Sequence, residues 1–158
     1  MGLDMYIEKY GKGKQVAYWR KVNSVHAFFE RECAGEHGLD DCQRVRVTKE
    51  IIEKLLVCCN GVIKELSAPT AKKTQRTDEV LECNEGKIET VPTDISVFSG
   101  KAAAAAMEHL PPQEGFFFGT YEIDDWYLED IKETAEICNK LLAETDFENE
   151  ELWYHAWW

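Results

Sequence analysis

The residue types best suited to binding a small ligand are grouped near the start of the sequence, at Trp19, Arg20, Asn23 and His26. If this stretch is a helix, side chains three and four residues apart lie on one face. An arginine can hold a phosphate or carboxylate through two parallel hydrogen bonds, and a histidine can donate a hydrogen bond or act as a general base. The pattern predicts a module that binds or cleaves a nucleotide or phosphate, with Trp126 as a further stacking surface. The structural alternative is that His26 packs against a sheet with one ring nitrogen hydrogen-bonded to backbone, while Arg20 pairs with an acid on the last helix.

The second set of candidate residues is acidic. Residues 121–158 hold 12 Asp and Glu but only 2 Lys and Arg, and so carry most of the net charge of −12. A negative field repels nucleic acid and anionic membranes and attracts basic partners. We therefore expect no direct nucleic-acid binding, no membrane contact, and binding to a basic protein surface; the alternative is an acidic face that only aids solubility. Five of the acids lie along one side of a predicted helix and are called the acidic stripe: Glu122, Asp125, Glu129, Glu133 and Glu136.

No pattern in the sequence indicates a cofactor or a known catalytic centre. The Gly-x-Ser-x-Gly, phosphate-loop, dinucleotide-binding, His-Glu-x-x-His and calcium-loop patterns are all missing. We expect no cofactor, and whether the protein catalyses a reaction stays open. The six cysteines include one adjacent pair, Cys58 and Cys59, whose side chains diverge by about 100° on a helix. We expect reduced cysteines and no bound metal.

Length and composition indicate one globular domain. The chain has 158 residues, of which 44% are hydrophobic and 30% are charged, which disfavours disorder. The first ten residues include Asp4 and lack the apolar stretch of a secretory signal. No uncharged apolar run approaches the ~20 residues that cross a bilayer. We expect a single domain over residues 1–158 that acts in a cytoplasm.

Local patterns predict the elements that position these residues. Four segments favour helices through apolar spacing or through a run of alanines: 16–34, 49–66, 101–110 and 124–143. Five segments favour strands or strand-like turns: 3–8, 43–47, 80–91, 115–119 and 152–158. The segment at 80–91 holds two short runs around Asn84-Glu85-Gly86 and is expected to form a hairpin. The segment at 152–158 is expected to dock as an edge strand or a plug, and residues 67–78 are expected to form an exposed connection. Together they predict an α+β fold, with three or four helices packed on a small, mostly antiparallel sheet.

The sequence also contains a combination of short motifs. MGLDMY occupies residues 1–6, YWRKVNSVH residues 18–26, DDC residues 40–42, GFFFG residues 115–119 and DDWYLEDI residues 124–131. This combination resembles a group of small bacteriophage and prophage proteins of unassigned function. The resemblance implies a phage-encoded protein that acts in the cytoplasm of a bacterial host, and it assigns no catalytic residue. Together with the acidic stripe, it leads us to expect an inhibitor or modulator of a host or defence protein.

Overall fold

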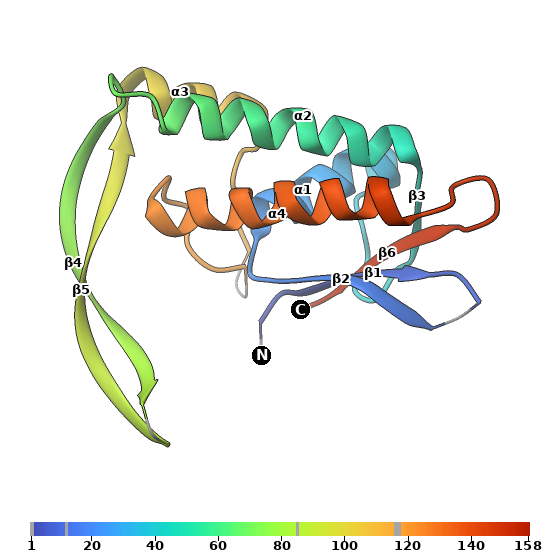
Figure 1. Ribbon diagram of the computed structural model, residues 1–158, viewed down its shortest axis with the longest axis horizontal. Helices are drawn as coiled ribbons and strands as arrows, with labels where there is room; N and C mark the ends of the chain where they lie inside the picture. Colours follow the sequence, from blue (N-terminus) through green and yellow to red (C-terminus); the bar gives the residue numbers. More distant parts are fainter. Residues whose placement is uncertain (1, 12, 85, 116–117) are drawn as a thin grey trace.

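The computed structural model describes residues 2–11, 13–84, 86–115 and 118–158. Figure 1 shows a body, in which helices lie over one side of a sheet, and a long two-stranded ribbon at one end of that body. Both sheets are antiparallel. The α+β class predicted from the sequence is confirmed.

The sheet of the body has the strand order β2-β1-β6-β3. β1 (Asp4–Lys9) and β2 (Lys14–Arg20) form a hairpin. β6 (Leu152–Trp157) pairs with β1 on one side and with β3 (Val45–Val47) on the other. The strand expected at 152–158 is therefore confirmed, but its expected place at an edge is wrong. Most side chains of β6 are buried, and pairing on both edges satisfies the backbone groups of such a strand.

The helix predicted over residues 16–34 is wrong in its first part. The chain before residue 21 forms β2, and α1 begins only at Asn23 (Asn23–Phe29) and continues as a π-helical segment over Glu30–Ala34. Within β2, Ala17 and Trp19 are buried and their neighbours are more exposed. Apolar residues at this spacing fit both a helix and a strand, and the hydrogen bonds that β1 offers across the hairpin favour the strand.

The two long helices form as predicted and pack on one another. α2 (Lys49–Leu66) begins at Thr48, whose hydroxyl accepts a hydrogen bond from the Ile51 N–H at 3.4 Å. α4 (Asp125–Glu144) begins after Asp124, whose carboxylate accepts one from the Tyr127 N–H at 2.9 Å. Such caps satisfy N–H groups that have no partner inside the helix. The structure describes no helix that is both long and apolar enough to cross a membrane. α2 buries five apolar side chains, each worth about 1.5 to 3 kcal/mol if fully buried: Ile52, Leu55, Cys59, Val62 and Leu66.

The alanine-rich helix α3 (Gly100–His109) packs against α2. Its residues Ala102 and Ala106 are buried, so small side chains lie at the contact. Gly61 of α2 serves the same close approach, because a Cβ atom at this position would lie 2.6 Å from Nε2 of His109. The predicted helix at 101–110 is confirmed, and the alanine run has a packing reason.

The ribbon consists of β4 (Lys72–Asn84) and β5 (Lys87–Ser99). The connection expected at 67–78 is wrong from Lys72 onward, and the hairpin expected at 80–91 is only the distal half of the ribbon. At its base the ribbon attaches to the body, where the N–H of Phe98 in β5 donates to the Ile123 carbonyl at 2.8 Å. Most of β4 is exposed, so burial leaves no apolar alternation in its sequence.

The aromatic segment at 115–119, expected to be a buried strand or a strand-like turn, lies partly outside the described residues, which omit 116 and 117. Gly115 and Phe118 belong to no strand, and the N–H of Phe118 donates to the Gly115 carbonyl at 3.1 Å. The Phe118 side chain is buried. The expectation of burial is confirmed at this one position, and the described residues of the segment, Gly115, Phe118 and Gly119, are not part of a strand.

Candidate functional site

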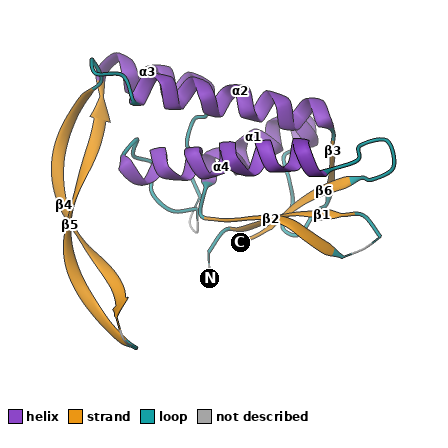
Figure 2. Cartoon of the chain, viewed as in Figure 1, coloured by secondary structure: helices purple, strands orange, loops and turns teal. Residues whose placement is uncertain are grey.

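One side of the four-stranded sheet carries aromatic side chains, and the helices that the structure describes all lie on the other side. Strand alternation directs Met5 and Ile7 of β1 toward the helices, where they are fully buried, and directs Tyr6 to the opposite side. Figure 2 shows the helices on one side of this sheet only. Cross-strand neighbours of Tyr6 continue the same surface, which we call the aromatic face: Tyr6, Tyr18, Trp153, His155 and Trp157.

The rings of the aromatic face contact one another around Tyr6. Its ring centroid lies 5.2 Å from that of Tyr18, 5.1 Å from that of His155 and 6.2 Å from that of Trp157. The His155 ring is stacked on Tyr6 at an interplanar angle of 17°. Tyr18 is 40% exposed and Trp157 is 55% exposed, so these two rings present surface to an incoming molecule, whereas His155 is buried.

Hydrogen bonds hold these rings in place. The Tyr18 hydroxyl donates to Oδ1 of Asp4 at 2.6 Å, and this bond raises the pKa of Tyr18. The Trp157 indole N–H donates to Nδ1 of His155 at 3.2 Å. The proton of a neutral His155 ring therefore lies on Nε2, which faces Oε1 of Glu8 at 3.5 Å. Ordering of the rings before binding lowers the entropy cost of binding.

The arginines near the aromatic face have acidic partners. The side chains of Arg20, Arg44 and Arg46 are each 60% exposed, and each lies within 4 Å of a carboxylate oxygen. Their positive charges are thus balanced locally, which leaves an aromatic surface with charge pairs around it. The pairs are Arg20 with Asp4 at 3.8 Å, Arg44 with Glu8 at 3.3 Å and Arg46 with Glu151 at 3.2 Å.

The predicted ligand cluster is not brought together. Arg20 lies on the open side of the sheet, at the register position opposite Asp4, whereas Trp19 points to the helix side and donates from its indole N–H to Thr134 Oγ1 at 3.0 Å. Asn23 and Trp126 line one common cavity, but its volume is about 30 Å³. That is room for about one water molecule and far below the roughly 300 Å³ of a small-molecule pocket.

His26 and Asn23 instead have structural partners. His26 is 1% exposed, and its Nδ1 lies 2.7 Å from the Tyr154 hydroxyl in a buried hydrogen bond. Burial lowers the pKa of His26. The amide nitrogen of Asn23 donates to the carbonyls of Phe118 and Thr120, and its oxygen accepts from the Gln113 N–H. These contacts are structural, but they differ from the expected ones: His26 bonds the Tyr154 hydroxyl and not a backbone group, and Arg20 lies near Asp4 of β1 and not near an acid of the last helix.

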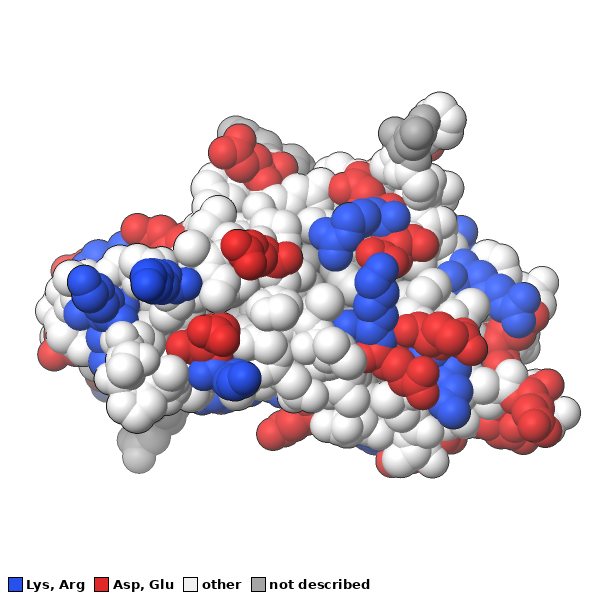
Figure 3. Space-filling model, turned by 90° about the horizontal axis from the view of Figure 1, so that it is seen from above, with Lys and Arg blue, Asp and Glu red and all other residues white. Residues whose placement is uncertain are grey.

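The acidic stripe divides into structural and exposed members. Glu122 pairs with Arg76 of the ribbon, and Oδ2 of Asp125 accepts from the Ser96 N–H at 2.6 Å, so both hold the ribbon to the body. The other three are exposed, and Nζ of Lys132 lies 3.6 Å from Oε2 of Glu129. Seen from the helix side, Lys and Arg are interspersed with Asp and Glu (Figure 3). The exposed members are Glu129, Glu133 and Glu136.

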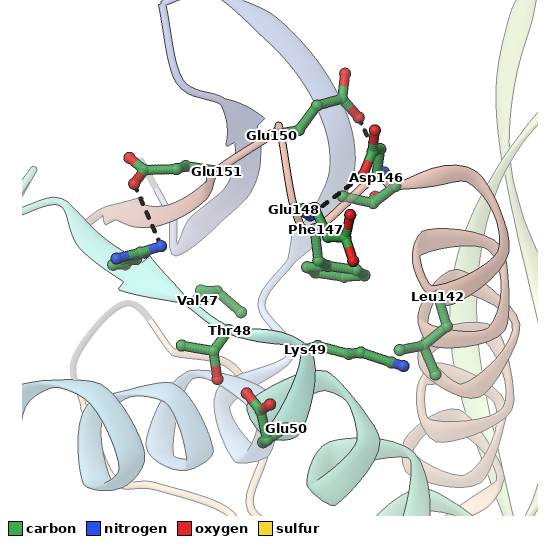
Figure 4. Close-up of a pocket in the computed structure, with 12 residues that line it drawn as sticks. Val47, Thr48, Lys49, Glu50, Leu142, Asp146, Phe147, Glu148, Glu150 and Glu151 are labelled. Carbon is green, nitrogen blue, oxygen red and sulfur yellow. Dashed lines mark hydrogen bonds and ion pairs between the residues drawn. The ribbon is translucent and has the colours of Figure 1, made fainter.

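A hollow of about 570 Å³ lies between the start of α2 and the loop that leads to β6. Figure 4 shows Lys49 extending along it toward Leu142. Its wall mixes cations with acids, and Arg46 is already paired with Glu151. Among the described residues, no three His, Cys, Asp or Glu side chains are grouped as ligands for a metal ion. The hollow therefore has neither a uniform charge nor a metal-ligand set that would select a ligand.

Sequence reasoning missed the aromatic face, although a signal for it was present. Trp153, His155 and Trp157 alternate with buried residues at period two, and Tyr6 and Tyr18 occur in segments of the same alternation. The pattern does not say which side of the sheet the helices cover. Comparison with family models, curated proteins and solved structures finds no match to this chain.

Proposed function

We propose that this protein binds another protein through the aromatic face of its sheet. The observation that carries the proposal is that helices cover one side of the sheet, while the other carries ordered aromatic rings in place of the polar residues usual on an open antiparallel sheet. Tyrosine, tryptophan and arginine are the residues enriched at the energetic centres of protein interfaces. An exposed apolar surface of this kind marks an interaction site.

The charges around the aromatic face favour a protein partner over a nucleic acid. A nucleic-acid strand requires cations that are free to neutralise its phosphates. Arg20, Arg44 and Arg46 each have an acidic partner, and the net charge of −12 adds repulsion at a distance. A protein with an apolar patch and an overall basic charge avoids both difficulties.

This proposal keeps the class of function expected from the sequence, a binding protein that acts on another protein, and changes the surface that does the binding. Two residues of the acidic stripe, Glu122 and Asp125, bind residues of the ribbon and are not available to a partner. The phage resemblance remains a prediction, and it directs the search for a partner to the host and defence proteins of bacteria.

Affinity capture from a bacterial lysate tests the proposal when three forms of the protein are compared. They are the wild type, the aromatic-face variant Tyr18→Ser/Trp157→Ser, and a control with Val57→Ser/Met107→Ser, which changes exposed apolar residues on α2 and α3. A captured protein is identified, purified and titrated against all three. Truncation of a residue at the centre of an interface costs about 2 kcal/mol, or roughly thirtyfold in affinity.

Support requires that the partner bind the wild type and the control at least tenfold more tightly than the aromatic-face variant. Equal affinity of both variants would overturn the proposal. Tight binding of a labelled single-stranded oligonucleotide, lost in the aromatic-face variant, would also overturn it and assign the face to nucleic acid.

A further inference from the structure

The distal half of the ribbon, residues 78–93, projects from the body with apolar side chains in solvent. Among its described side chains none is buried, and Leu81 and Ile88 are 71% and 74% exposed. A two-stranded ribbon by itself is marginally stable in water. Large apolar side chains on such an element indicate a surface that is covered when a partner is present.

Strand geometry gives the distal ribbon two different faces. One carries Leu81, Cys83 and Ile88 together with Glu79, and the other carries Glu82 and Glu89 together with Val80, Val91 and Lys87. Leu81 and Ile88 lie on the same face, through the register that pairs Leu81 with Thr90. On the opposite face Glu82 lies directly across from Glu89. Directly paired residues have Cβ atoms about 4.5 to 5.5 Å apart, and like charges so placed repel. A lysine or arginine from a partner, placed beside both carboxylates, removes that repulsion.

The edge of the ribbon formed by β5 is unsuited to adding a strand. The N–H groups of Ser96 and Phe98 point away from β4, toward Asp125 and the Ile123 carbonyl. By the alternation of an antiparallel strand, Pro92 faces the same outer edge, where it has no N–H to offer. Proline and charged residues are the means by which exposed edges resist pairing. Strand addition at the β5 edge is therefore disfavoured, which leaves the faces of the ribbon and its β4 edge as contact surfaces.

The ribbon extends toward the side of the molecule on which the aromatic face lies. Figure 1 shows that its tip continues past the level of the four-stranded sheet, on the side of the sheet that carries no helix. The ribbon stands at one end of the body and the sheet lies toward the other, so a protein docked on the aromatic face would reach the distal ribbon if it extends along the body to that end.

We propose that the distal ribbon is a second contact for the partner bound at the aromatic face, and that it inserts into a groove with one apolar and one basic wall. Leu81 and Ile88 pack on the apolar wall, and a lysine or arginine of the basic wall lies beside Glu82 and Glu89. This inference rests on the proposed function, since it assigns both surfaces to one partner. The carboxylates of Glu82 and Glu89 repel phosphate groups, which disfavours a nucleic acid as the molecule that receives the ribbon.

Photo-crosslinking tests this inference separately from the proposed function. The crosslinking amino acid p-benzoylphenylalanine replaces one residue at a time in the full chain: Leu81 on the ribbon, Tyr18 on the aromatic face, and the exposed Val57 of α2 as control. Each protein is irradiated in bacterial lysate and its adducts are identified by mass spectrometry. The expected result is one and the same protein at positions 81 and 18, and no adduct at 57.

The basic wall is tested by charge reversal. Glu82→Lys/Glu89→Lys is expected to lower the yield of the position-81 adduct at least tenfold. Glu133→Lys/Glu136→Lys makes the same change in net charge on exposed residues of α4 and is expected to leave that yield within twofold.

Each alternative outcome has a distinct meaning. An adduct at 18 with none at 81, or with a different protein at 81, overturns the ribbon inference and leaves the proposed function standing. No adduct at either position overturns both. Equal loss from the two charge reversals overturns the basic wall, and an adduct to nucleic acid at 81 overturns the inference as a whole.

Discussion

Replacement of Asn23 tests whether this residue of the predicted ligand cluster has a structural role or a ligand-binding role. The side chain is 4% exposed and makes three hydrogen bonds to backbone groups of the loop before α4, at 3.0 Å to the Phe118 carbonyl, 2.9 Å to the Thr120 carbonyl and 3.2 Å from the Gln113 N–H. A hydrogen bond contributes about 0.5 to 1.5 kcal/mol net, and more when its loss leaves a buried group unpaired. Asn23→Ala is therefore expected to lower the free energy of unfolding by about 2 to 4 kcal/mol.

Urea denaturation followed by tryptophan fluorescence measures this loss. With a denaturant slope of about 2 kcal/mol per molar urea, the midpoint should fall by about 1 to 2 M with the slope unchanged. Asn23→Asp should be at least as harmful, because a carboxylate oxygen would then face two carbonyl oxygens. The control is Arg20→Ala, whose guanidinium is exposed and lies 3.8 Å from Asp4, and which should change stability by less than about 0.5 kcal/mol. A loss below about 1 kcal/mol for Asn23→Ala, or one equal to that of the control, would refute the structural role.

Four further outcomes are expected. Burial, followed by the charge of a nearby glutamate, raises the pKa of Asp130 from 3.8 to about 7. The contribution of Asp130 to stability is therefore present below pH 3.8 and is lost as the pH rises through 7. In denaturation experiments, the free energy of unfolding of Asp130→Asn should exceed that of the wild type by about 1 to 2 kcal/mol at pH 8 and by less at pH 5. Burial lowers the pKa of His26, so stability should fall as the pH drops below about 6.5, the pKa in the unfolded chain, and NMR titration of the native protein should place the pKa of His26 below that value. In thiol labelling of the native protein, the exposed Cys42 and Cys83 should react first, and all six cysteines should react after denaturation; fewer than six would contradict the expectation of free thiols. Replacing residues 79–91 by a two-residue Asn-Gly turn should leave the body's melting temperature within about 2 °C, because the described side chains removed are not buried, and a larger drop would show that the distal ribbon supports the body.

The helices that the sequence predicted well are those whose signals are local. α2 and α4 each combine a long apolar stripe with a capping residue, Thr48 and Asp124, and both pieces of information lie within one stretch of chain. Their boundaries at the start follow from side-chain hydrogen bonds to the first turn. Such elements are set by the 3.6-residue period and by caps, which a single sequence displays directly.

The elements that were wrong depend on partners far away in the chain. The segment at 16–20 became a strand because β1 pairs with it, and β6 took the centre of the sheet because β1 and β3 both pair with it. Spacing along the chain carries neither fact. Arg20 and His26 are separated for the same reason: Arg20 lies in a strand and not in the helix of His26, and a strand places alternate side chains on opposite sides of a sheet.

The candidate site was hard to predict for a related reason. An aromatic residue in a strand pattern predicts a buried core position. Tyr154 of β6 is fully buried, but Trp157 of the same strand is 55% exposed. The difference is the side of the sheet on which the helices pack, which is a property of the whole fold. The sequence predicted only the distal half of the ribbon, as a hairpin over 80–91. Residues 72–78 were missed because this mostly exposed part of β4 lacks the alternation that burial imposes.

The central place of β6 has a consequence for how the chain reaches its native state. β6 follows every other helix and strand in the order of synthesis, yet it joins β1 to β3, about 150 and 105 residues earlier in the sequence. Until it is made, each of those strands has an edge with unpaired backbone groups, and such edges are prone to pair with other chains. We therefore expect slow completion of the sheet, governed by this late and distant pairing, and we expect chains interrupted before residue 152 to aggregate.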